Sequence, residues 1–336
     1  MRRLGVFLFG IFLSVGVGVC VQSDASLASA ETAEVYIGGM PAGFTLSAGG
    51  AQVLGFSDIL TDNGVRSPAS ESGMRAGDLI VGAEGISLKT IQELNEIIDK
   101  NGNKTLHLDV IRGETKLKIE LLPAKDKATG RYKIGVLIRD GVSGIGTVTY
   151  IDAKNGRFGA LGHAVLGSDS RTLSLTDGQM YSCNIVGVSK GIKGKAGELR
   201  GMILAEKSLG KAEKLCTCGI YGKISGTFET KGLRAAKASA ESAKPGKASI
   251  YSTVSGETPQ EYSIEIVKVD KMQRDNKNFV VKITDNALIE ETGGIVQGMS
   301  GSPIIQDGKL IGAITHVFVN DPTRGYGISI DKMLQQ

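Results

Sequence analysis

Tryptophan is absent from this chain of 336 residues, and only 5% of its residues are aromatic. Glycine, by contrast, occurs 47 times. Many glycines with few long apolar stretches favour a turn-rich β protein over a helical bundle. Hydrophobic residues make up 41% of the chain and charged residues 22%, which excludes a disordered chain and is ordinary for globular domains. The length suits two domains.

Strong charge, paired cysteines and clustered histidines are also lacking. The net charge of +4 is spread along the chain, and no basic and aromatic residues cluster, so we exclude a nucleic-acid-binding protein. Cys183, Cys216 and Cys218 are an odd number after residue 30, a poor basis for a disulfide framework. The three histidines are scattered, and Cys216-Thr217-Cys218 lacks the spacing of a zinc knuckle. The sequence therefore predicts neither a metal nor another cofactor.

The first thirty residues have the pattern of a targeting segment. Arg2 and Arg3 precede an apolar run from Leu4 to Val21, and Ala28-Ser29-Ala30 offers a small-residue cleavage site. The run is also about as long as a bilayer-spanning helix requires, roughly 20 residues. Residues 1–30 are predicted to be a signal peptide or an uncleaved membrane anchor, and the remainder is expected outside the cytoplasm.

Residues 31–124 are predicted to form a small α+β domain. Strands are expected at 44–46 and 51–56, joined by a hairpin turn at Ala48-Gly49-Gly50.

A helix and a second hairpin follow in the same domain. Thr90 and Glu93 have the spacing of a capping box, and Gly102 is placed to end the helix. Apolar residues then alternate with polar ones over 106–121, which predicts a hairpin with one dry face.

The segment Ser67–Asp78 reads Ser-Pro-Ala-Ser-Glu-Ser-Gly-Met-Arg-Ala-Gly-Asp. It resembles the signature of bacterial PDZ domains, in which Ser-Pro-Ala precedes Ala/Ser-Gly-hydrophobe-x-x-Gly-Asp. The resemblance implies a peptide ligand, bound as an added strand with its terminal carboxylate on backbone N–H groups. Val53–Phe56 is one candidate for the groove, but it is expected in the second strand of the first hairpin. We favour the segment before that hairpin, although Gly43 could equally be a simple turn residue. The favoured groove residues are Gly43, Phe44, Thr45 and Leu46.

Residues 125–336 differ in pattern. Short apolar stretches are interrupted by glycine every few residues, and helical periodicity is scarce. About two hundred residues of this kind suit a double β-barrel. The basic stretch 231–247 is predicted to be an exposed linker or loop.

The clearest chemical motif is Gly298-Met299-Ser300-Gly301-Ser302-Pro303, followed by a β-hairpin. Chymotrypsin-like peptidases carry their nucleophile in Gly-x-Ser-Gly-Gly/Ser-Pro. A glycine before the serine permits the tight backbone that aims two N–H groups at one oxyanion. A plain Gly/Ser turn is the alternative. The motif predicts Ser300 as nucleophile, with Gly298 and Ser300 as oxyanion hole.

A serine hydroxyl needs a base, and the region after residue 124 contains two histidines. His163 ends a Gly/Ala-rich strand, like the strand that precedes the catalytic histidine of chymotrypsin-like enzymes, and it is predicted to be the base. His316 lies on the strand after Ser300, where it is expected to line the substrate groove. The expected partners of the substrate backbone are Thr315, His316 and Val317.

A carboxylate should orient the imidazole. Asp169, Asp177 and Asp285 are candidates. Asp285 ranks first because it ends an apolar strand shortly before Ser300, where rigid presentation is easiest.

Four segments together resemble the stage IV sporulation protein B peptidase family. They are Thr292–Pro303, Thr315–Thr323, Gly159–His163 and Lys282–Asp285. The likeness covers nearly the whole chain, from leader through PDZ to the C-terminus. It implies a mainly β fold, in which a small α+β PDZ domain precedes a chymotrypsin-like double-barrel peptidase domain. It also implies that His163, Asp285 and Ser300 form the catalytic triad.

The resemblance further implies a role in endospore formation. Such a peptidase is secreted from the forespore into the space between two membranes and trims its own N-terminal region. It then cleaves the ectodomain of a membrane protein that keeps an intramembrane metalloprotease silent, so that a mother-cell sigma factor is activated. The PDZ domain is expected to restrain the peptidase and to contact its target.

Two other functions are consistent with parts of the pattern. A general quality-control peptidase of the exported PDZ type would degrade unfolded proteins, but its PDZ domain follows the protease, whereas here it comes first. A non-catalytic PDZ scaffold would carry an inactive barrel. The complete set of Ser, His and Asp argues against the scaffold.

Overall fold

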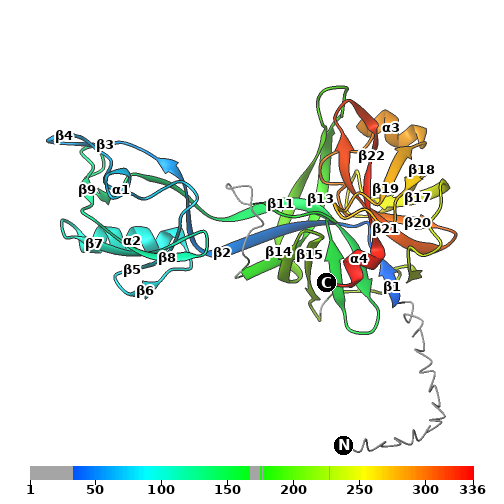
Figure 1. The fold of residues 1–336 in the computed structure, drawn as a ribbon, viewed down its shortest axis with the longest axis horizontal. Coiled ribbons are helices and arrows are strands. Elements are labelled where there is room, and N and C mark those ends of the chain that lie inside the picture. Colours follow the sequence, from blue (N-terminus) through cyan, green and yellow to red (C-terminus); the bar gives the residue numbers. More distant parts are fainter. Residues whose placement is uncertain (1–32, 167–174, 176, 227) are drawn as a thin grey trace, which may run out of the picture. The chain divides into compact units, whose positions relative to one another are not determined.

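The computed structural model describes residues 33–166, 175, 177–226 and 228–336 (Figure 1). The expected leader, residues 1–30, and the candidate acid Asp169 lie outside the described residues. Within the described ranges, no helix has both the length and the apolar character needed to span a membrane.

Six antiparallel strands close into a first barrel. Each strand pairs with the next in the order β2, β13, β14, β15, β12 and β11, and β11 pairs again with β2. Closure leaves the ring without a free edge. Phe44, Phe158 and Met180 are among its buried core residues. The strands are β2 (Pro41–Phe56), β11 (Val136–Asp152), β12 (Arg157–Ala160), β13 (Asp177–Ser189), β14 (Glu198–Cys216) and β15 (Gly219–Ile224).

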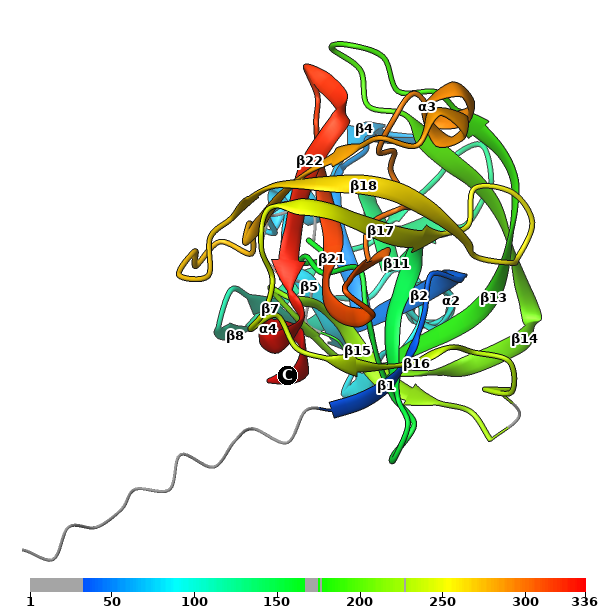
Figure 2. The ribbon, with the colours of Figure 1, turned by 90° about the vertical axis from the view of Figure 1, so that its right-hand side faces the viewer.

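A second six-stranded antiparallel barrel closes in the order β17, β18, β19, β22, β21, β20 and back to β17. Figure 2 shows β17, β18, β21 and β22 curving around the interior of this second barrel. Phe279, Ile304 and Ile328 are almost completely buried inside it. The strands are β17 (Gly246–Ser252), β18 (Gln260–Val269), β19 (Phe279–Ile283), β20 (Pro303–Gln306), β21 (Lys309–Phe318) and β22 (Asp321–Ser329).

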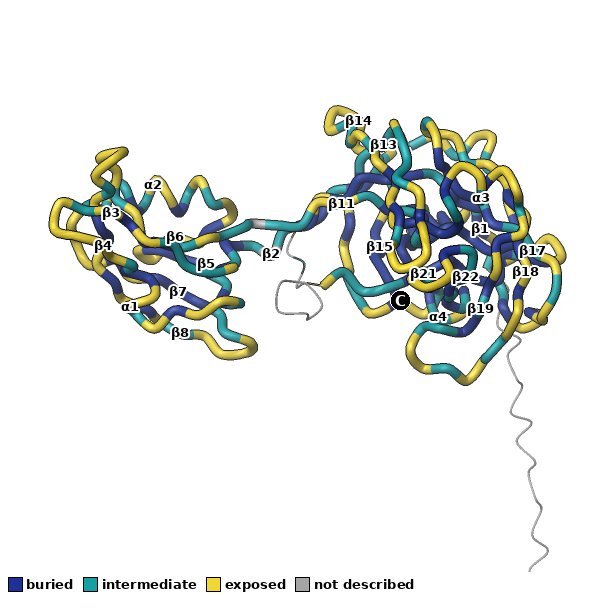
Figure 3. The backbone as a smooth tube through the Cα atoms, turned by 90° about the horizontal axis from the view of Figure 1, so that it is seen from above, coloured by how far each residue is buried: buried dark blue, intermediate teal, exposed yellow. Residues whose placement is uncertain are grey.

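Short elements join and flank the barrels. Strand β1 (Ala33–Ile37) pairs with β11 and with β16 (Ala235–Ala238), and β16 meets β21 in parallel. Helix α3 (Asn286–Thr292) leads toward the loop of Ser300, and α4 (Ile330–Leu334) ends the chain. In Figure 3 the buried stretches, drawn dark blue, gather mainly in the interior of the region that the barrel strands form.

The PDZ domain is inserted between barrel strands. Its own core runs from Ala51 to Ile138 and so includes the second part of β2 and the beginning of β11. The predicted boundaries, 31–124 and 125–336, were therefore wrong at both ends, because β1 and the first part of β2 pair with peptidase strands. The PDZ elements are β3 (Ile59–Thr61), β4 (Gly64–Arg66), α1 (Pro68–Glu71), β5 (Leu79–Ala83), β6 (Ile86–Ser87), α2 (Ile91–Asn101), β7 (Leu106–Arg112), β8 (Thr115–Leu121), β9 (Ala124–Lys125) and β10 (Tyr132–Lys133).

The predicted hairpin turn at Ala48-Gly49-Gly50 was also wrong. Strand β2 continues through these residues, and its pairing with β11 shifts register between Arg139 and Gly141. A Cβ on Gly50 would lie 2.4 Å from the carbonyl oxygen of Ile80, so the glycine serves close strand packing and not a turn.

The predicted peptide-binding residues Gly43, Phe44, Thr45 and Leu46 lie in the first barrel. They pair with β11 on one edge and with β13 on the other, so no edge remains for an added peptide strand. A Cβ on Gly43 would lie 2.5 Å from the side chain of Ile203, which explains the glycine there. That groove prediction was wrong.

The local PDZ predictions are confirmed. Thr90 accepts the N–H of Glu93 while the Glu93 carboxylate accepts the N–H of Thr90, which is a capping box, and Gly102 ends α2. The hairpin over 106–121 forms with Leu106 opposite Leu121.

Candidate active site

Ser300 lies in the loop that precedes β20 of the second barrel. Its Oγ donates a hydrogen bond to the carbonyl of Thr315, 2.8 Å away on β21. Gly298 and Gly301 on either side both have a φ of +97°, a conformation that side chains with a Cβ rarely adopt. The glycines of the motif are therefore required by the backbone path that exposes Ser300.

The first barrel holds this loop from the other side. Thr147 Oγ1 donates to the Gly298 carbonyl at 2.8 Å, and the Thr147 N–H donates to the Ser300 carbonyl at 3.0 Å. Thr149 Oγ1 donates to the Gly301 carbonyl at 2.8 Å. Neither threonine was predicted from the sequence. Their signal was two threonines at alternate positions, and so on one face, of the apolar stretch 145–151.

The N–H groups of Gly298 and Ser300 are the predicted oxyanion hole. Neither donates to a backbone carbonyl in the described part of the chain, whereas the N–H groups of Met299, Gly301 and Ser302 all do. With the Gly298 carbonyl turned to Thr147, the two remaining N–H groups are available to an oxyanion.

His163 follows β12 in the first barrel and lies near Ser300 around one pocket. Its Nδ1 is 2.9 Å from the carbonyl of Ala164. A carbonyl oxygen can only accept, so Nδ1 carries the proton, and in the neutral ring Nε2 is the nitrogen with the free lone pair. That is the tautomer a general base requires.

His316 lies beside His163, with ring centroids 5.1 Å apart and the planes tilted by 43°. The pKa of His316 is lowered from 6.5, first by partial desolvation of its ring and then by His163 and Lys277. A neutral His316 places no positive charge beside the imidazolium that forms when His163 takes a proton.

The predicted residues meet around a cavity of about 440 Å³ between the barrels. His163 enters from the first barrel, and Gly298 and Ser300 from the second. The expected substrate-binding residues Thr315, His316 and Val317 line the same cavity. Its further walls, among them Ile145 and Ala196, were not predicted.

Asp285, the predicted acid, lies apart from the cavity that His163 and Ser300 share. Its Oδ1 accepts the N–H of Leu288 at 3.0 Å, which caps α3, and its Oδ2 accepts the N–H of Ser263 at 3.3 Å. It does not line the cavity of Ser300. In the structure, His163 Nδ1 bonds the Ala164 carbonyl and Asp285 bonds the N–H groups of Leu288 and Ser263, so the predicted hydrogen bond between Asp285 and His163 is not formed. The alternative acid Asp177 lies at the start of β13 and pairs with Lys211.

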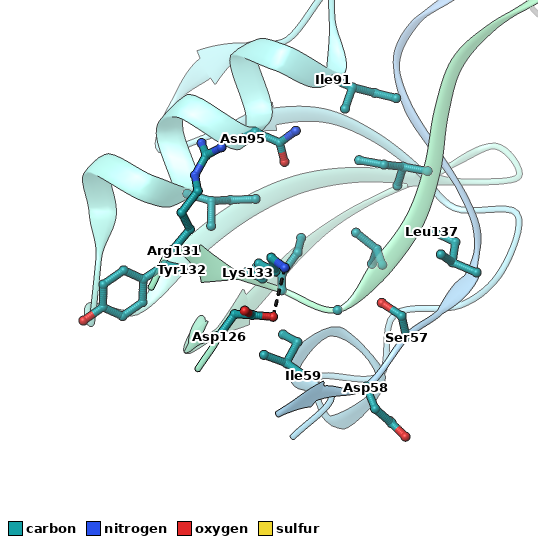
Figure 4. Close-up of a pocket in the computed structure, with 15 residues that line it drawn as sticks. Ser57, Asp58, Ile59, Ile91, Asn95, Asp126, Arg131, Tyr132, Lys133 and Leu137 are labelled. Carbon is teal, nitrogen blue, oxygen red and sulfur yellow. Dashed lines mark hydrogen bonds and ion pairs between the residues drawn. The ribbon is translucent and has the colours of Figure 1, made fainter. Parts of the chain in front are cut away.

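A second cavity, of about 460 Å³, lies in the PDZ domain between α2 and the beginning of β11 (Figure 4). Val136, Leu137 and Ile138 pair with β2 on one edge only, and their other edge borders this cavity. Ile91 and Ile98 of α2 form part of the wall. An open strand edge beside a helix is the geometry that binding of a peptide as an added strand requires.

One end of the PDZ cavity is charged. Lys133 Nζ lies 2.9 Å from Asp126 Oδ2, the contact dashed in Figure 4. Lys133 first, and Thr129 second, lower the pKa of Asp126 to about 2. This ion pair is therefore intact throughout the neutral range.

Two closed antiparallel barrels that present a serine and an imidazole to one cavity define a chymotrypsin-like serine endopeptidase. Comparison with protein families shows to which peptidase family the chain belongs. The chain belongs to the SpoIVB peptidase S55 family, whose model matches residues 130–334. A PDZ domain model matches residues 62–112.

Similar individual proteins were also found. A Nostoc protein named as a zinc metalloprotease is 33% identical over 76 residues, which is 21% of each chain, so the match covers only a fifth of that relative. The PDZ domain of an SdrC-like protein of Listeria monocytogenes is 24% identical, covering 27% of this chain and 87% of that one, with a TM-score of 0.22. The Rv3671c protease of M. tuberculosis, in its active form, is 13% identical, covering 58% and 73%, with a TM-score of 0.34.

Proposed function

We propose that this serine endopeptidase acts in the signalling that accompanies endospore formation. In this role it is secreted from the forespore, trims its own N-terminal region and cleaves the ectodomain of a membrane regulator. That cleavage releases an intramembrane metalloprotease and leads to activation of a mother-cell sigma factor. The observation that supports this most strongly is the SpoIVB peptidase family match over 130–334, which contains both His163 and Ser300.

In the proposed reaction, the Ser300 hydroxyl turns from the Thr315 carbonyl to Nε2 of His163 and attacks the substrate carbonyl. His163 takes the hydroxyl proton and later gives it to the leaving amine, while the oxyanion binds the N–H groups of Gly298 and Ser300. The Ala164 carbonyl keeps the imidazole in the required tautomer. Asp285 acts as a positioning residue through α3.

The substrate is proposed to lie as an extended strand along Thr315, His316 and Val317. Strand β20 pairs with β21 as far as Ala313, and the loop of Ser300 bonds the backbone of Ile314, so the edge beyond Ile314 is open to a substrate backbone.

The PDZ cavity is proposed to bind a peptide segment of the same target along Val136–Ile138. The N-terminal leader would keep both sites on the extracytoplasmic side of the forespore membrane.

The test is incubation of the purified chain with the ectodomain of a membrane regulator of an intramembrane metalloprotease, with mass spectrometry of the products. Ser300→Ala is the control. Discrete fragments that are absent with Ser300→Ala are expected. If a fluorophosphonate labels Ser300 but the ectodomain stays intact, the chain is a peptidase with another target, and the sporulation role is wrong.

A further inference from the structure

The wall of the active-site cavity contains no charged side chain among the residues described. Its apolar part comes from both barrels and from two loops. Leu161, Ile295 and Val296 are at most 8% exposed, so they form a fixed floor and not a mobile rim. The apolar wall consists of Ile145, Leu161, Ala196, Ile295, Val296 and Val319.

The polar groups lie on the reactive side of the cavity. Gln297, Thr315 and His316 are uncharged liners next to Gly298 and Ser300. Thr315 already uses its carbonyl for Ser300. None of these groups can neutralise a lysine, arginine, aspartate or glutamate side chain, and burial of an unpaired charge is strongly unfavourable.

Geometry decides which substrate residue enters. The carbonyl that Ser300 attacks must lie against Ser300 Oγ with its oxygen toward the N–H of Gly298. The side chain on the adjacent Cα then enters the cavity that begins at these same two residues. The geometry points to a primary specificity pocket for an uncharged aliphatic side chain on the residue whose carbonyl is attacked. This inference rests on the peptidase activity and does not depend on the sporulation role.

Peptides that differ only at this residue test the inference directly. Internally quenched peptides with Leu, Asn, Lys or Glu before the scissile bond are compared by kcat/KM, with the cleaved bond verified by mass spectrometry. Leucine and asparagine have nearly the same shape, so this pair separates apolarity from size. Leucine is expected to exceed asparagine by about tenfold and lysine or glutamate by about a hundredfold. Equal rates, or a preference for a charged residue, would overturn the inference.

A charge placed in the wall should change the preference. Val319 is 49% exposed, so Val319→Asp brings a carboxylate to the cavity at little risk to folding. The lysine-to-leucine ratio of kcat/KM is expected to rise by about tenfold or more. Val186→Asp is the matched control, because Val186 is 63% exposed on β13 and does not line the cavity. An unchanged ratio in Val319→Asp, or the same rise in both variants, contradicts the assignment.

A binding measurement tests the specificity pocket even if the chain shows no peptidase activity. Ser300→Ala is titrated with intact peptides that carry Leu or Lys before the scissile bond and an amidated C-terminus, which offers the PDZ domain no terminal carboxylate, and binding is measured by fluorescence anisotropy without any turnover. Tighter binding of the Leu peptide, by about tenfold or more, supports the pocket even where no peptide is cleaved. Equal binding of the two overturns it. Labelling of Ser300 by a fluorophosphonate reports separately on the peptidase itself.

Discussion

The signature loop of the PDZ domain and the loop of Ser300 differ in the contacts that limit their sequence. In the PDZ loop, the decisive contacts are made by charged side chains. Asp78 is 1% exposed and accepts two hydrogen bonds of 2.7 Å from the Arg112 guanidinium and one from the N–H of Arg75. The Gly-Asp of the PDZ signature thus has a clear physical role, because its carboxylate ties the loop before β5 to the end of β7.

Around Ser300, the limiting contacts are close approaches of the main chain to glycine residues. A Cβ on Gly301 would lie 2.1 Å from the carbonyl of Thr147, and one on Gly219 would lie 2.1 Å from the carbonyl of Ala160. The barrels must bring backbone N–H groups to one point, and such close approach leaves no room for side chains. The PDZ signature loop should therefore be sensitive to the loss of a side chain, and the active-site loop to the gain of one.

The largest effect is expected for Gly301→Ala. Its new Cβ would meet the Thr147 carbonyl and the backbone N–H of Leu161, neither of which can give way, at a φ of +97°. Activity should fall by about a hundredfold or more, since the loop of Ser300 must move. Gly308→Ala is the matched control, because its φ is +75° but no atom lies within 4 Å of the added Cβ. Fluorophosphonate labelling and peptide cleavage measure both variants. Equal losses would mean that φ, and not the contact with Thr147, requires the glycine.

The loss of a side chain, in contrast, should lower the stability of the PDZ domain. Arg112→Ala leaves the buried Asp78 carboxylate without its cation, which costs about 3 kcal/mol. Urea unfolding, followed by a probe in the PDZ domain, should show an early transition while Ser300 still reacts with the fluorophosphonate. Arg66→Ala is the control, since Arg66 and Glu71 form an exposed pair that contributes much less. If labelling of Ser300 is lost at the same urea concentration at which the PDZ probe unfolds, the PDZ domain and the barrels are not stabilised separately.

The same difference decides what the sequence could predict. The capping box of Thr90 and the hairpin over 106–121 depend on neighbours within one element, so periodicity and spacing predict them. The nucleophile motif is equally local, because the positive φ of Gly298 and Gly301 requires those residue types.

Other predictions required knowledge of distant partners. Ala48-Gly49-Gly50 has turn composition, yet β2 continues because Ile80 packs closely against Gly50. Phe44 was assigned to a PDZ groove because its barrel partners on β11 and β13 are about a hundred residues or more away in the chain. The wall of the active-site cavity could not be predicted for the same reason, since it is assembled from both barrels.

At Asp285 the barrel region also depends on a charged side chain, because this carboxylate caps α3. Asparagine caps helices as well as aspartate, whereas alanine costs about 1 kcal/mol. We therefore expect Asp285→Asn to keep its activity within a few-fold and to leave the pH profile of kcat/KM unchanged. Asp285→Ala should lower the free energy of unfolding and weaken activity. A loss of about 10⁴-fold in Asp285→Asn, with unchanged unfolding, would instead place Asp285 in a triad.

The smallest effect concerns His316. Its pKa is lowered in the folded state from 6.5, chiefly by partial desolvation of the ring and then by His163. As pH falls, the unfolded chain therefore binds a proton at this position before the folded chain does. The resulting stability is complete above about pH 6.5 and is lost as pH falls through the folded pKa. His316→Gln should remove this dependence, a change of less than about 1 kcal/mol because the ring is exposed. Urea unfolding at pH 7 and pH 5 measures it, and an equal change in the free energy of unfolding between the two pH values in both proteins would show that folding does not lower the pKa of His316.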